Sequence, residues 1–119
     1  MARDVVTVTA LPMDAGTARP TGTTVDVSNG MSIPVSGDTH KLIVELTQTD
    51  ATARVATFAA PTDNPHAVRS GIGNLAITCA QNVPQYVPLE SARFAQSDGS
   101  IHINFAASFA GTVRAYRLP

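Results

Sequence analysis

The sequence predicts a single-domain, all-β antiparallel β-sandwich of jelly-roll-like form, with eight or nine short strands and little helix. Short runs rich in Thr, Val and Ile recur along the chain, and Gly, Pro, Asn-Gly or Asp-Gly interrupts them about every ten residues. Several of these runs alternate apolar and polar residues, as half-buried strands do. At 119 residues the chain is expected to form one domain, residues 1–119, with a core that needs no disulfide or metal.

The first third of the chain supplies three of the expected strands. Residues 5–10 alternate Val and Thr and form the first strand, and residues 14–22 follow as an aperiodic loop. Residues 23–27 form the second strand, and Asn29-Gly30 is a tight turn into a third at 31–35. Pro34 cannot donate a backbone hydrogen bond, which places this third strand at a sheet edge.

The clearest strand of the sequence covers residues 40–49. Leu42, Val44 and Leu46 fall on one face and are assigned to the core. Glu45 falls on the opposite face and is expected to point into solvent. The pattern is that of a strand with one buried and one exposed face.

The second half continues in the same manner, with further strands expected at residues 53–59, 75–79, 83–87, 101–105 and 111–119. Ile101, Ile103 and Phe105 alternate with polar neighbours and join the predicted core. Cys79 has no cysteine partner and is interpreted as a small buried apolar residue. Residues 61–73 are expected to form a long loop, and residues 88–96 are the best helix candidate, with one or two turns at most.

Composition excludes several partners. Eight basic residues against nine acidic ones give a formal net charge of −1, and the basic residues are scattered singly, whereas nucleic-acid binding needs a basic stripe. No run approaches the ~20 apolar residues of a membrane helix, and no secretory leader is recognised at the start. We therefore expect a protein made in the cytoplasm that binds neither nucleic acid nor membrane. Because charged residues make up 14% of the chain, the surface does little to oppose self-association.

No catalytic or metal site is expected. His40, His66 and His102 lie far apart in the sequence, and none has a His or Cys partner at ligand spacing. Asp98 and Ser100 flank an Asp-Gly turn and lack the strained elbow of a serine nucleophile. The sequence therefore predicts a protein that is not an enzyme and has no cofactor or metal.

Two residues of the last strand are candidate interface residues. Arg114 and Tyr116 project from one face of that strand, and both residue types are enriched at the centres of protein interfaces. The alternative is that Tyr116 packs at a sheet margin with its hydroxyl group in water.

Several segments of the chain resemble the head decoration, or capsid cement, proteins of tailed bacteriophages. The likeness spans nearly the whole chain, and its most specific stretch is 88–94, Pro-Leu-Glu-Ser-Ala-Arg-Phe. The other segments that carry it are Gly22-Thr23-Thr24-Val25-Asp26 with Asn29-Gly30, residues 42–47, Gly71-Ile72-Gly73-Asn74-Leu75, Asp98-Gly99-Ser100-Ile101 and residues 111–119.

The resemblance implies a structural role in the virion. Such proteins bind the major capsid protein on the outer surface of the capsid, usually as homotrimers, and stabilise the shell through many repeated contacts. Residues 1–4 are a candidate N-terminal arm, and we expect Ala2, Arg3 and Asp4, together with the loop 14–22, to contact the capsid. The alternatives are another virion component of the tail or head fibre, and then a carbohydrate-binding module. The last is disfavoured because Trp is absent and two Tyr residues alone could stack on a sugar.

Overall fold

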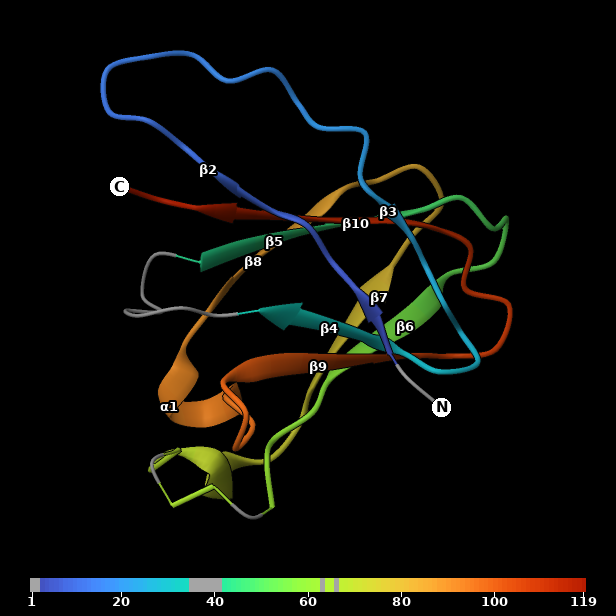
Figure 1. Ribbon diagram of the computed structural model, residues 1–119. Helices are drawn as coiled ribbons and strands as arrows, with labels where there is room; N and C mark the ends of the chain where they lie inside the picture. Colours follow the sequence, from blue (N-terminus) through green and yellow to red (C-terminus); the bar gives the residue numbers. More distant parts are fainter. Residues whose placement is uncertain (1–2, 35–41, 63, 66) are drawn as a thin grey trace.

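The computed structural model describes residues 3–34, 42–62, 64–65 and 67–119, and it confirms an all-β sandwich (Figure 1). The first sheet has the strand order β1-β4-β9-β6-β7. The second has the order β2-β10-β5-β8, with β3 also paired to β10. The strands are β1 Asp4–Val5, β2 Val8–Ala10, β3 Thr23–Thr24, β4 Met31–Pro34, β5 Leu42–Gln48, β6 Arg54–Phe58, β7 Leu75–Cys79, β8 Gln85–Leu89, β9 Ser100–Phe105 and β10 Gly111–Arg117.

The two sheets are mixed, whereas the sequence analysis expected antiparallel pairing throughout. Strand β1 runs parallel to β4, and β2 runs parallel to β10. Both exceptions come from residues 4–10, and the alternation assigned 5–10 of these to one strand. The chain instead passes from the first sheet to the second at Val6, which is fully buried between them. One predicted strand is thus divided between two sheets.

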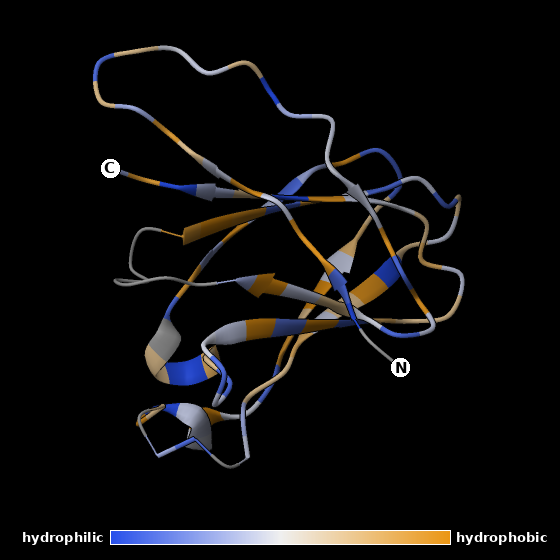
Figure 2. Ribbon diagram, viewed as in Figure 1, coloured by the Kyte–Doolittle hydropathy of each residue, from blue (hydrophilic) through white to orange (hydrophobic). Residues whose placement is uncertain are grey.

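The predicted core is confirmed. Leu42, Val44 and Leu46 are at most 4% exposed, and Ile101 and Ile103 are fully buried. The remaining predicted core residues, Phe105 and Cys79, are buried as well. Figure 2 shows the alternation of hydrophobic and hydrophilic residues along β9, which follows from the period of two in a strand that buries one face.

The turn at Asn29-Gly30 forms as expected, but it does not join two strands of a hairpin. Asp26 accepts the backbone N–H of Asn29 on its side chain and that of Gly30 on its carbonyl, and Gly30 has a positive φ of 73°. Strand β3 before the turn pairs with β10, whereas β4 after it pairs with β9. The segment is therefore a crossover between the sheets.

Strand β4 is also not a simple edge strand. It pairs with β9 on one side, and Met31 and Ser32 pair with β1 on the other. Pro34 lies beyond the two residues that β1 covers, so its missing donor disturbs no pairing on that side. Val35, at the end of the predicted strand, lies outside the described residues.

One end of the sandwich is closed by short helices. The single turn α1, Ser91–Phe94, and the 3-10 turn η2, Ser70–Ile72, lie together at the bottom of Figure 1. The ring of Phe94 is buried, with its centroid 6.2 Å from that of Phe58. The guanidinium carbon of Arg93 lies 4.8 Å from the centroid of the Phe94 ring. The expected helix at 88–96 is thus one turn long, and Pro88 belongs to β8 instead.

Candidate functional site

The loop of residues 11–22, here called the strap, crosses the outer face of the second sheet. It arches away from β2 and returns to β3 at the top of Figure 1. The backbone N–H of Leu11 donates to the carbonyl of Arg117 at 2.8 Å. At the other end, Arg114 donates to the carbonyls of Pro20 and Thr21 at 2.7 and 2.8 Å. Residues of β10 therefore hold the strap at both of its ends.

Gly22 allows the strap to approach β10 this closely. Its φ is 89°, and a Cβ atom at this position would lie 3.1 Å from side-chain atoms of Thr112 and Arg114. A larger residue would meet both the backbone strain and this crowding. Glycine is therefore required at the point where the strap rejoins the sheet.

Glu45 corrects the expectation that this carboxylate faces solvent, because it is 1% exposed beneath the strap. Its Oε2 accepts two N–H groups of Arg19, the Nε donor at 3.0 Å, and its Oε1 accepts the Tyr116 hydroxyl at 2.8 Å. The guanidinium of Arg114 lies 3.8 Å from Oε2. Glu45 is thus the hub of a network that joins the strap to β5 and β10.

The network keeps Glu45 ionised. Burial by itself raises the pKa of a carboxyl group, but the hydrogen bonds from Arg19 and Tyr116 and the charges of Arg19 and Arg114 outweigh it, and the pKa of Glu45 is lowered. Burial and the bond to Glu45 raise the pKa of the Tyr116 hydroxyl. At neutral pH the carboxylate therefore accepts hydrogen bonds while Tyr116 donates one.

The strand register places these groups in rows across the sheet. One row across the outer face contains Arg114 of β10, Glu45 of β5 and Tyr86 of β8, which are paired in the strand register. The next row on the same face contains the pair Tyr116 of β10 and Ile43 of β5. Between these rows and the strap lies a cleft of about 360 Å³. It is lined by Leu11, Thr17, Arg19, Ile43, Glu45, Tyr86 and Tyr116. Mainly apolar walls with a few convergent polar groups are typical of a small-ligand site.

The residues expected to form an interface have other roles. Arg114 is 9% exposed, and its donors bind the strap and the threonines beside it, so it holds the fold together. Tyr116 is half-buried, with its hydroxyl on Glu45 rather than in water. Neither side chain projects freely from the sheet.

The candidate arm is partly a strand. Asp4 belongs to β1, opposite Met31, and Arg3 donates to the carbonyl of Ile103 at 3.1 Å. Ala2 lies outside the described residues. The described part of the segment 1–4 is therefore attached to the first sheet and is not a free arm.

Asp98, Ser100 and His102 form no catalytic arrangement. Ser100 directs both its hydroxyl, at 2.7 Å, and its backbone N–H to Asp98, a local turn that explains both residues. His40 and His66 lie outside the described residues. Among the residues that the structure describes, no three His, Cys, Asp or Glu side chains gather as metal ligands would.

A second hollow, of about 380 Å³, lies beside α1. Its charged groups are already engaged, because Arg69 pairs with Glu90 at 2.6 Å and Arg93 donates to the carbonyls of Gly73 and Asn74. These bonds fasten the 61–73 loop to the end of the sandwich. We treat the cleft beneath the strap as the candidate site because both tyrosines line it beside the Arg19–Glu45 ion pair.

Sequence reasoning did not single out Arg19, expected Glu45 to face solvent, and considered Tyr86 only as one of two tyrosines that could stack on a sugar. Glu45 was recognised as lying on the outer face, and the register that sets it beside Tyr86 and Arg114 depends on pairing between distant strands. The one signal in the sequence was a charged residue, Arg19, within an otherwise uncharged part of an aperiodic loop.

Comparisons with protein-family models, curated proteins and solved structures found no match to this chain. Within the described ranges, no helix has the length and apolar character needed to cross a membrane.

Proposed function

We propose that this protein is a decoration protein that binds the major capsid protein on the outer surface of a tailed-phage capsid as a homotrimer. Its resemblance to that family supports the proposal, as do its compact two-sheet sandwich and its low content of charged residues. A structural subunit of this kind needs a stable core and one adhesive surface, and repetition over the shell supplies the avidity.

The observation that carries the choice of contact surface is the exposed Val5, 62% accessible on β1. β1 is the outermost strand of its sheet, and such an edge can accept an extended segment of a partner. Val27, also exposed, lies in the turn that precedes Gly30, whose carbonyl accepts the N–H of Asp4. We define this region, Arg3 to Val5 with Val27, as the N-terminal edge and assign the capsid contact to it.

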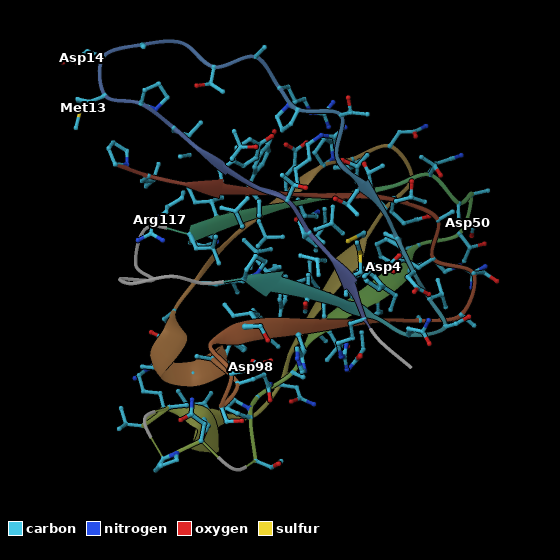
Figure 3. All side chains as sticks on the ribbon, in the orientation of Figure 1. Asp4, Met13, Asp14, Asp50, Asp98 and Arg117 are labelled. Atoms are coloured by element: carbon cyan, nitrogen blue, oxygen red, sulfur yellow. The ribbon has the colours of Figure 1, made fainter. Side chains whose placement is uncertain are left out.

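The strap and the N-terminal edge lie on different parts of the molecule. Figure 3 places Asp4 well apart from Met13 and Asp14 at the tip of the strap. A single capsid surface is therefore assigned to one of the two segments. Arg19 and the carbonyls of Pro20 and Thr21 bind the strap to its own sheet, whereas the N-terminal edge combines the exposed Val5 and Val27 with the outermost strand of a sheet.

The test is co-sedimentation of the protein with capsids that lack it. Val5→Glu should lower the affinity for the capsid at least about tenfold, because a charge would be buried at the contact. Val68→Glu is the matched control, since Val68 is 80% exposed and lies in the 61–73 loop near η2. Equal binding of the two variants, with unchanged melting temperatures, would contradict the assigned surface.

The oligomeric state is tested separately by light scattering of the purified protein and by particle reconstruction of decorated capsids. A mass three times that of the 12.4 kDa chain, or threefold density on the capsid, is expected. Failure of the wild-type protein to bind any capsid of its own phage would overturn the proposed function itself.

A further inference from the structure

The cleft beneath the strap contains both tyrosines of the chain. Tyr116 forms one side of it and Tyr86, 62% exposed, forms another, with Ile43 between them on the sheet. Two tyrosines in 119 residues gave little reason to expect a stacking site, yet the pairing of β5 with β8 and β10 brings both to one cleft. Flat rings beside an aliphatic floor favour a ligand with an apolar ring face.

The polar end of the cleft carries charges of both signs. Glu45 supplies a carboxylate, and Arg19 supplies a guanidinium whose side chain is 52% exposed. Arg19 is already paired with Glu45, so a charged ligand would have to compete with this ion pair, a carboxylate with Glu45 for Arg19 and a cation with Arg19 for Glu45. A neutral ligand with hydroxyl groups leaves the pair in place and accepts hydrogen bonds from the exposed guanidinium of Arg19.

We propose that this cleft binds one pyranose ring of a neutral glycan. The C–H face of the ring packs on Tyr86 and Tyr116, and its hydroxyl groups accept hydrogen bonds from Arg19, which Glu45 holds in place from beneath. The volume of about 360 Å³ falls within the range of small-ligand sites and admits a single ring. The inference stands on the cleft alone and does not depend on binding to a capsid.

The absence of Trp makes the cleft directly observable. The two tyrosines are the main fluorophores of the protein, so a change in its intrinsic emission on adding sugar reports on this site. The probes are the methyl glycosides of glucose, galactose and mannose, and N-acetylglucosamine, with saturation-transfer NMR as a second readout. At least one should bind with a dissociation constant of about 1 mM, as suits a ligand of roughly a dozen heavy atoms.

Two variants locate the binding. Tyr86→Ala should weaken it about tenfold through the loss of one aromatic wall, and Tyr86→Phe should retain it. Ile72→Ala, at an exposed residue of η2, is the control for removing exposed apolar surface elsewhere. Melting temperatures verify that each variant is folded.

The charged analogues cyclohexanecarboxylate and cyclohexylammonium test the argument from charge, and both should bind more weakly than the best sugar. The proposal is overturned if no sugar in the panel binds, if Tyr86→Ala leaves binding unchanged, or if either charged ring binds more tightly than every sugar. Because these measurements use the free protein, their failure would leave the capsid experiments unaffected.

Discussion

Replacing Glu45 by Gln tests whether the buried carboxylate holds the strap to the sheet. The substitution keeps the size of the side chain but removes its charge and sets an amide N–H₂ against the donors around it. Arg114, 9% exposed, then loses its nearby negative charge, at a cost of about 2 kcal/mol. The bond from Tyr116 to a neutral acceptor is weaker by about 1 kcal/mol.

Together these losses lower the free energy of unfolding by about 3 kcal/mol, which corresponds to a fall in Tm of about 12 °C for a domain of this size. Urea denaturation followed by circular dichroism gives the free energy, with an unchanged m value showing that the same surface unfolds. Arg19→Gln is the comparison variant. Its side chain is half-exposed and can regain hydrogen bonds from water, so the loss should be smaller than for Glu45→Gln. A Glu45→Gln loss below about 1 kcal/mol, or one no larger than that of Arg19→Gln, would refute the role of Glu45 as the hub.

Three further predictions concern the core, acid and metal. Phe105→Ala should lower the free energy of unfolding by about 3–5 kcal/mol in urea denaturation, because the Phe105 ring is buried with its centroid 4.9 Å from that of Phe109. An unchanged free energy of unfolding would contradict its place in the core. The pKa of Glu45 is lower in the folded protein than in the unfolded chain, where it is about 4.3. Ionised Glu45 therefore stabilises the fold above pH of about 4.3, and this stabilisation is lost as the pH falls through the pKa of the folded state. A pH series of melts should therefore show a shallower acid decline in Glu45→Gln than in wild type, and parallel declines would contradict this. EDTA should leave the melting curve in place, since the described residues form no ligand cluster, and a fall restored by one particular ion would reveal a metal site.

The core was predictable because alternation within one strand is a local property. Ile101, Ile103 and Phe105 need no knowledge of the partner strands to be assigned to one face, and the sandwich buries that face. The same reasoning identified the outer face that carries Glu45 but could not say what covers it. The strap is an aperiodic segment, and its position depends on bonds between residues about a hundred positions apart, such as Leu11 with Arg117.

The pairing of the first strands likewise could not be predicted from the local pattern of residues. The run of Val and Thr at 5–10 is compatible with one strand, yet Val6 marks the point where the chain changes sheets. The turn at Asn29-Gly30 was correctly located from its residues, whereas its role as a crossover depends on which distant strands β3 and β4 join. The capsid and glycan assignments remain proposals that the experiments above address.

The two anchors of the strap make its tip a natural insertion point. Leu11 is hydrogen-bonded to Arg117 at one end, and Arg114 is hydrogen-bonded to Pro20 and Thr21 at the other. Residues 13–16 therefore lie between two fixed points of the strap. Space around Gly16 is open, and Met13 is 69% exposed. A longer loop between fixed ends costs only about 0.6 kcal/mol for each doubling of its length. Foreign peptides inserted at this position would extend into solvent and leave both anchors of the strap in place.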